Sequence, residues 1–262
     1  MKPISILFAL ALSIHFLSAQ TYQEVPELKK CFKDMGVVGT FVLFDDATDT
    51  MLVCDEARAK KRFTPASTFK IANSLIGLDI GAVNNVDQVL PYGGKPQPRK
   101  EWERDMGLRE AIKISNVPIY QDLARRIGIE RMREGVRKLG CGNMEIGRVV
   151  DRFWLDGPLA ISAIEQTEFL QRLVKGSLPV NPNALRAVKE ITLLEKTDIY
   201  ELHGKAGWAI GPTAPQIGWW VGWIERENRV YPFALNIDMQ SDADAAKRIP
   251  IGRECLKVLG KL

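Results

Sequence analysis

The sequence predicts an α+β (layered α/β) fold, in which helices flank an antiparallel sheet built from both ends of the chain. Strand-like patterns occur near the two ends of the 262 residues, whereas the middle has helical periodicity. This order favours one sheet with an all-helical subdomain inserted at roughly residues 82–195. An apolar content of 46% is enough for a full core in a chain of this length.

The first expected elements are two strands joined by a polar turn. Residues 37–44 and 51–54 are rich in apolar side chains, and three aspartates lie in the turn between them. A helix is expected from Ser67 to Asp79, because Pro65 fixes φ ahead of helix-compatible residues and a glycine follows the run. Residues 91–96 are rich in glycine and proline and predict a loop.

Helices are expected through the middle of the chain. Apolar residues recur at helical intervals in residues 108–114, 118–127 and 129–139. Ser162-Ala163-Ile164-Glu165 is a capping box that opens a helix to about Val174. Asn181-Pro182 opens another helix to about Leu194.

Three strands and a helix are expected to close the chain. The strands cover residues 201–208, 217–225 and 230–238, and the helix covers residues 242–259. Because these strands share a sheet with the N-terminal pair, a cleft is expected between the sheet and the helical insertion.

Ser67 and Lys70 place a hydroxyl and an amine three residues apart in a run expected to be helical. Side chains at this spacing lie on one face of a helix and can touch. A serine needs a base to become a nucleophile, and the chain has only two histidines, His15 and His203. His15 lies in a stretch expected to be removed. The favoured interpretation is therefore a nucleophile with an amine base.

Two further triplets support this interpretation, since one serine–lysine pair at this spacing is expected by chance. Ser115-Asn116-Val117 follows a helical stretch, and Lys205-Ala206-Gly207 lies in an expected strand. In chain order, the three boxes are similar to S-x-x-K, S-D-N and K-T-G, the signature of serine β-lactamases and penicillin-binding proteins.

With these residues, the chain resembles the class D (oxacillinase-type) serine β-lactamases over nearly everything after residue 30. Class D is favoured over class A because the middle box ends in valine. Cys141 and Ala206 depart from the family, which has Tyr or Phe at the first position and Thr or Ser at the second. The likeness also covers Gly142-Asn143, Phe153-Trp154-Leu155 and the run from Trp219 to Trp223.

The resemblance implies the serine β-lactamase and penicillin-binding fold and the hydrolysis of β-lactam antibiotics. Ser67 would attack the amide carbonyl, Lys70 would take its proton, and Ser115 would relay a proton to the ring nitrogen. Lys70 would also carry a carbamate formed from carbon dioxide or bicarbonate, with no other cofactor. Trp154 would donate a hydrogen bond to that carbamate, because an indole N–H can only donate.

An amine base requires a low pKa, because a lysine with the ordinary pKa of about 10.4 is an ammonium at neutral pH. Burial beside Val117, Trp154 and Leu155 is expected to depress the pKa of Lys70.

The substrate contacts also follow from the resemblance. Backbone N–H groups of Ser67 and Trp208 would bind the oxyanion. Lys205 and Arg248 would bind the substrate carboxylate. The remaining expected substrate-binding residues are Val117, Leu155, Ala206 and Gly207.

Residues 1–19 have the plan of a secretory signal peptide: Lys2, then an apolar run, then Ser18-Ala19. This predicts a periplasmic enzyme without a stable membrane anchor, with residues 20–262 forming one catalytic domain.

The formal net charge of +4 is too small to indicate nucleic acid as a partner. The four cysteines could pair in three ways or remain free, and their spacing matches no metal site. The oligomeric state stays open.

Three other functions remain open from the sequence. A D,D-peptidase or transpeptidase would use the same three boxes on a peptidoglycan stem. A penicillin sensor would acylate without turnover, and Ala206 raises the possibility of an inactive scaffold. The apolar lining expected around Lys70 favours an enzyme that can deacylate.

Overall fold

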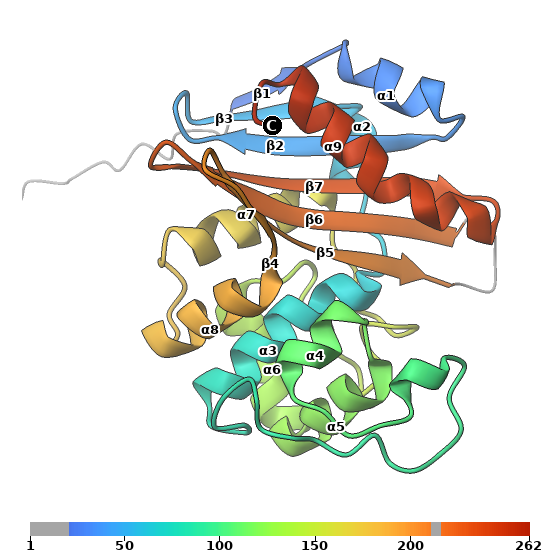
Figure 1. Cartoon of the computed structure of the whole chain (residues 1–262), viewed down its shortest axis with the longest axis vertical. Helices are drawn as coiled ribbons and strands as arrows, with labels where there is room; N and C mark the ends of the chain where they lie inside the picture. Colours follow the sequence, from blue (N-terminus) through green and yellow to red (C-terminus); the bar gives the residue numbers. More distant parts are fainter. Residues whose placement is uncertain (1–20, 211–215) are drawn as a thin grey trace, which may run out of the picture.

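The structure is a computed structural model that describes residues 21–210 and 216–262. A sheet with helices on both faces stands above a group of helices (Figure 1). Within the described residues, the sheet has seven strands in the order β1-β3-β2-β7-β6-β5-β4. The strands are β1 (Thr21–Glu24), β2 (Gly39–Asp45), β3 (Thr50–Cys54), β4 (Leu193–Lys196), β5 (Glu201–Ala209), β6 (Gln216–Arg226) and β7 (Arg229–Met239).

Both ends of the chain contribute to this sheet, as the sequence predicts. The hairpin β2–β3 joins the meander β5–β6–β7 through antiparallel pairing of β2 with β7, in which Thr40 lies opposite Asn236. The expectation of a wholly antiparallel sheet is wrong at one edge, where β1 runs parallel to β3. The predicted α+β fold class is confirmed.

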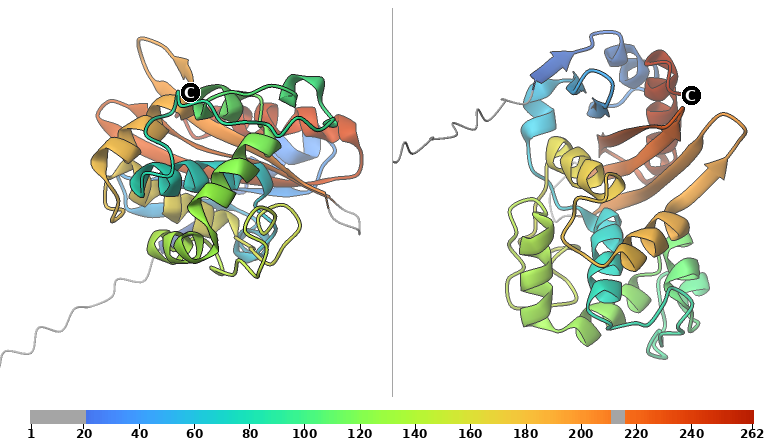
Figure 2. Two further views of the ribbon diagram at one scale, coloured as in Figure 1. Left: turned by 90° about the horizontal axis from the view of Figure 1, so that it is seen from below. Right: turned by 90° about the vertical axis from the view of Figure 1, so that its left-hand side faces the viewer.

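Helices cover the two faces of the sheet differently (Figures 1 and 2). On one face, α9 packs against β6, β7 and α1, whereas α7 packs on β2 and β7 from the other face. Side chains of β2 alternate accordingly: Phe41 and Leu43 join the core under α9, and Val42 and Phe44 join the core on the α7 side. The α-helices are α1 (Leu28–Asp34), α2 (Glu56–Lys60), α3 (Lys70–Asp79), α4 (Leu108–Lys113), α5 (Val117–Ile127), α6 (Ile129–Leu139), α7 (Ala163–Val174), α8 (Pro182–Thr192) and α9 (Arg248–Val258).

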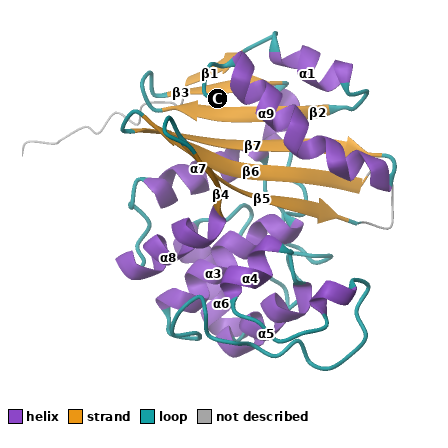
Figure 3. Cartoon of the chain, viewed as in Figure 1, coloured by secondary structure: helices purple, strands orange, loops and turns teal. Residues whose placement is uncertain are grey.

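The helical group in Figure 3 is organised around α3. This helix is buried along most of its length and contacts α5, α6 and α8. Three short 3₁₀ segments complete the described part of the chain: η1 (Ala66–Phe69), η2 (Lys100–Trp102) and η3 (Asp242–Lys247). Because η1 contacts both α3 and β5, it joins the helical group to the sheet.

Several local predictions need correction. The helix expected to reach about Leu194 ends at Thr192, because Leu193 pairs with His203 and starts the edge strand β4. The expected final helix begins as η3 and becomes α-helical only at Arg248. The elements β1, α1 and α2 were not expected, since each is too short for its periodicity to stand out.

The expected signal peptide lies outside the described residues. Within residues 21–210 and 216–262, none of the helices has the length and apolar character needed to cross a membrane.

Candidate active site

Ser67 and Lys70 meet where a 3₁₀ turn becomes an α-helix. Ser67 lies in η1 and Lys70 is the first residue of α3. Side chains three residues apart are eclipsed in a 3₁₀ turn. Nζ of Lys70 lies 2.8 Å from Oγ of Ser67, so the expected contact between amine and hydroxyl is present.

Left-handed backbone conformations occur at two points of the site. Ala66, directly before Ser67, has φ of 48°, and Ser115 has φ of 59°. Residues other than glycine seldom adopt this conformation, and it persists where the surrounding structure holds it, often at active sites. Ser115 lies between α4 and α5, where its N–H donates to the carbonyl of Ile112. Val117 opens α5, which packs on α3 behind Lys70.

Lys70 is fully buried. Its Nζ lies 5.2 Å from the ring centroid of Tyr120, and no carboxylate of the described residues forms an ion pair with it. Burial, followed by the positive charge of Lys205, lowers the pKa of Lys70 well below its ordinary value. Lowering the pKa raises the fraction of neutral amine, which is the form that can accept a proton.

Trp154 is fully buried next to the start of α3. Its ring stacks on Phe69, the neighbour of Lys70, with centroids 5.6 Å apart, and Phe153 packs edge-on against both rings. Within residues 21–210 and 216–262, Nε1 of Trp154 has no hydrogen-bond partner. Buried indole N–H groups normally find an acceptor. Leu155 is half-buried at the edge of the same core.

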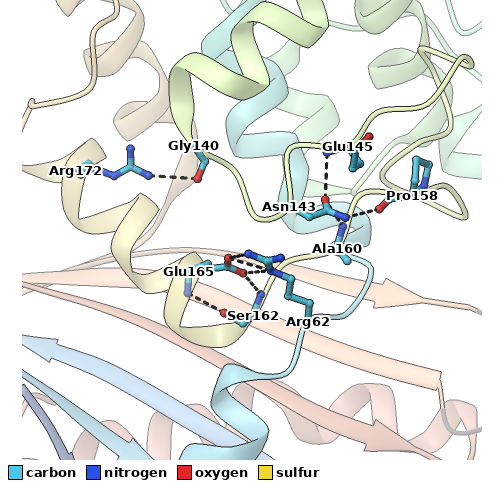
Figure 4. A network of polar contacts seen from close by, with 9 residues as sticks. All are labelled: Arg62, Gly140, Asn143, Glu145, Pro158, Ala160, Ser162, Glu165 and Arg172. Carbon is cyan, nitrogen blue, oxygen red and sulfur yellow. Dashed lines mark hydrogen bonds and ion pairs between the residues drawn. The ribbon is translucent and has the colours of Figure 1, made fainter. Parts of the chain in front are cut away.

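The loop that carries Trp154 is closed by Asn143 (Figure 4). Its Oδ1 accepts hydrogen bonds from the backbone N–H of Glu145 at 3.2 Å and of Ala160 at 3.1 Å. Gly142 has φ of 53°, and a Cβ there would lie 2.2 Å from the carbonyl oxygen of Ala160. The family-like pair Gly142-Asn143 is therefore needed to close this loop.

A second set of contacts joins the end of this loop to the chain just before η1. Phe63 and Ile161 exchange two backbone hydrogen bonds of 2.9 Å each. Arg62 donates to the carboxylate of Glu165, which also takes part in the predicted capping box with Ser162 (Figure 4). The position of Trp154 is thus coupled to that of the serine-bearing turn.

The third box lies on β5, directly beside η1. A Cβ on Gly207 would lie 3.0 Å from both the carbonyl oxygen of Pro65 and Cγ2 of Thr68, so glycine allows the strand to approach the turn. Lys205 is buried, and its Nζ donates to the carbonyl of Ala206 at 2.8 Å. Burial, then the charges of Arg248 and Arg99, lower the pKa of Lys205 to about 7.

Ala206, Trp208 and Arg248 lie toward the opposite face of β5. The side chains of Ala206 and Trp208 pack on the core under α9, and Nε1 of Trp208 donates to Oε1 of Gln216. Arg248 begins α9, and its guanidinium donates to the carbonyls of Gly207 and Ala245. Burial lowers the pKa of Arg248, with the charge of Arg99 adding to the effect. Arg248 is therefore packed against the third box and is not a free surface residue.

Sequence reasoning missed two buried polar residues around η1, Asn73 and Gln166. Nδ2 of Asn73 donates to the carbonyl of Tyr120 at 3.2 Å, which links α3 to α5. Nε2 of Gln166 donates to Oγ1 of Thr68 at 2.7 Å, which links α7 to η1. The only signal for either of them is the spacing of Asn73, which follows Lys70 by three residues.

The four cysteines of the chain are buried free thiols, among them Cys141, the departure noted above. Cys141 lines a small hollow with Thr68 and Phe69, behind η1. Burial raises the pKa of its thiol to about 12, so Cys141 stays protonated and packs as an apolar group.

The fold and the three boxes define a protein of the penicillin-interacting serine group. Residues 39–257 match the family described as the penicillin binding protein transpeptidase domain.

Individual relatives give a narrower assignment. The chain is 39% identical to the β-lactamase OXA-10 of Pseudomonas aeruginosa over 92% of each chain. The class D β-lactamase FUS-1 (OXA-85) from Fusobacterium nucleatum subsp. polymorphum is 45% identical with a TM-score of 0.88, over 92% of this chain and 100% of that structure. The class D β-lactamase YbXI from Nostoc is 42% identical with a TM-score of 0.87, over 90% of this chain and 99% of that structure. The chain belongs to the class D serine β-lactamases.

Proposed function

We propose that the protein hydrolyses β-lactam antibiotics through an acyl-enzyme on Ser67, with Lys70 as general base. The observation that carries this proposal is the 2.8 Å contact between Nζ of Lys70 and Oγ of Ser67, made by a fully buried lysine. A hydroxyl becomes nucleophilic when a base within hydrogen-bond reach takes its proton.

In acylation, Oγ of Ser67 forms a bond to the carbonyl carbon of the ring amide while Lys70 takes the hydroxyl proton. The carbon–nitrogen bond then breaks, and Ser115 passes a proton to the departing nitrogen. In deacylation, a base at Lys70 deprotonates water, which attacks the ester carbonyl and releases Ser67. The backbone N–H groups of Ser67 and Trp208 would stabilise the oxyanion in both steps.

The surroundings of Lys70 fit a carbamate on Nζ. A neutral amine reacts with carbon dioxide, and the resulting carbamate would supply an anionic general base. Nε1 of Trp154, a buried donor lacking an acceptor among the described residues, would hold that anion. Val117 on α5 and Leu155 would keep the base away from bulk water.

Lys205 and Arg248 would bind the carboxylate of the substrate beside the acylated serine. Lys205 is only 7% exposed and no carboxylate pairs with it within residues 21–210 and 216–262, so its charge is open to an incoming anion. We also propose that residues 1–19 direct export to the periplasm. The enzyme would then make its host resistant to β-lactams.

The test is hydrolysis of a chromogenic cephalosporin by the wild-type protein, Ser67→Ala and Ser177→Ala, combined with intact mass spectrometry. Ser177 is exposed and serves as the matched control. The proposal predicts turnover and a transient adduct with the mass of the substrate for wild type and Ser177→Ala, and neither for Ser67→Ala. A stable adduct without turnover in the wild type would indicate a penicillin sensor. Turnover of a peptide ending in D-Ala-D-Ala, without β-lactam turnover, would indicate a D,D-peptidase.

A further inference from the structure

Arg99 holds an unassigned positive charge next to the candidate active site. Its guanidinium carbon lies 5.6 Å from the ring centroid of Trp102. Nε1 of Trp102 donates to the carbonyl of Ile114 at 3.1 Å, and Nδ2 of Asn116 donates to the carbonyl of Trp102 at 3.3 Å. These contacts attach the loop around η2 to the residues on either side of Ser115.

The charge of Arg99 acts on the far wall of the site as well. It contributes to the lowered pKa values of both Lys205 and Arg248, which lie on β5 and α9. Arg99 therefore lies within electrostatic range of both groups, although its loop is attached to the helical group beside Ser115. For Lys205 and Arg248, the nearby charges that shift the pKa are all positive, so the surroundings of these two residues favour anions.

Arg99 is not neutralised by a strong local partner. Its only ion pair within residues 21–210 and 216–262 is with Glu101, at 3.2 Å. Both side chains are more than half exposed. Exposed pairs of this kind contribute little and exchange readily with other partners. The guanidinium is thus free to turn toward a ligand in the cleft.

We propose that Arg99 is a specificity-determining residue that favours β-lactams with a second carboxylate in the acyl side chain. The inference depends on the function proposed above, in which Lys205 and Arg248 bind the ring carboxylate. That carboxylate and the acyl side chain lie on opposite sides of the β-lactam ring. A cation whose loop is attached beside Ser115, within electrostatic range of Lys205 and Arg248, is therefore placed for a charge on the side chain.

The test compares two penicillins that differ by one carboxylate, carbenicillin and benzylpenicillin. The measured quantity is the ratio of kcat/KM for carbenicillin to kcat/KM for benzylpenicillin. Arg99→Gln should lower this ratio about three- to fivefold, mainly through KM for carbenicillin. Arg99→Lys should keep most of the preference, and added salt should shrink it, because the contact is exposed and screened. Arg137→Gln, which removes an exposed arginine on α6, is the matched control and should leave the ratio unchanged.

A second variant should change the ratio in the opposite direction. Glu101→Gln removes the carboxylate paired with Arg99 and should raise the ratio. An unchanged ratio in Arg99→Gln, or equal losses for both penicillins, would overturn the proposal. Equal losses would mean that Arg99 acts on the ring carboxylate. Absence of benzylpenicillin hydrolysis by the wild-type protein would instead contradict the proposed function. Failure of the Arg99 proposal and failure of the proposed function therefore give different results.

Discussion

Lys70 has the environment of a base because it is buried and no carboxylate of the described residues pairs with it. The sequence predicts that its amine touches the Ser67 hydroxyl, since the spacing is local. Its burial depends on packing by distant segments, including the one that carries Tyr120. The spacing S-x-x-K therefore predicts the contact, and only the packed structure supplies the desolvation that lowers the pKa of Lys70.

Trp154→Phe removes the buried indole donor and keeps an aromatic ring stacked on Phe69. We expect deacylation to slow by roughly ten- to a hundredfold, because a hydrogen bond to a charged group contributes about 1.5–3 kcal/mol. Acylation should slow less. Pre-steady-state kinetics with a chromogenic cephalosporin would separate the two steps. Trp220→Phe, which changes a buried indole on the other face of the sheet, is the control. Equal slowing of both steps would point to a packing defect.

Ala206→Thr introduces the hydroxyl that the resemblance to the family leads us to expect in the third box. Ala206 faces the same side of β5 as Trp208 and the helix bearing Arg248. A hydroxyl there should assist Lys205 and Arg248 in binding the substrate carboxylate. We predict a rise in kcat/KM for penicillins of about tenfold, mostly through KM. If kcat/KM stays constant in Ala206→Thr while Arg248→Ala lowers it severely, position 206 has no part in carboxylate binding.

At the scale of elements, the site depends on how closely β5 approaches η1. The sequence predicts both elements, but their contact follows from the missing side chain at Gly207. Sequence patterns also missed β4, because Leu193 has a helical neighbourhood and pairs with β5 only in the folded chain. Local propensity is weaker than such tertiary pairing.

Gly207→Ala should move β5 and η1 apart. The added methyl would lie 3.0 Å from the backbone of Pro65, which must move and carry Ser67 with it. We expect kcat/KM to fall by about a hundredfold or more, since small displacements of reacting groups have large effects. Gly204→Ala on the same strand is the control, because it introduces the same methyl on the other face of β5. Equal losses of activity in both variants would assign the effect to strand stability.

For the whole molecule, hydrophobic patterns predict the sheet, the helical middle and their order correctly. They cannot predict the parallel pairing of β1, which depends on where the N-terminal segment docks. The cationic side chains within electrostatic range of Lys205, including Arg99, also come from distant segments whose proximity no local pattern indicates.

Stability should depend on pH through Lys205. Its pKa is about 7 in the folded protein and 10.5 ordinarily, so the unfolded chain binds more protons between these values. The free energy of unfolding must therefore rise with pH, by on the order of 1 kcal/mol between pH 7 and about pH 8.5. Urea unfolding at several pH values would measure the rise. Lys205→Gln should reduce the rise, although Lys70 still contributes to it, whereas Lys196→Gln, at an exposed position, should leave it unchanged. A slope that is identical in all three proteins would contradict the low pKa of Lys205.

The central claim is that Lys70 is the general base and works as a carbamate. The most direct measurement is the NMR spectrum of the protein in isotopically labelled bicarbonate, recorded together with hydrolysis rates as the pH is lowered. We predict one carbamate resonance, absent from Lys70→Ala, that declines in acid in parallel with activity. Protonating a carbamate releases carbon dioxide, so added bicarbonate should restore both. Full activity in carbon dioxide-free buffer, with no carbamate resonance at any pH, would contradict the carbamate and leave the bare amine as base.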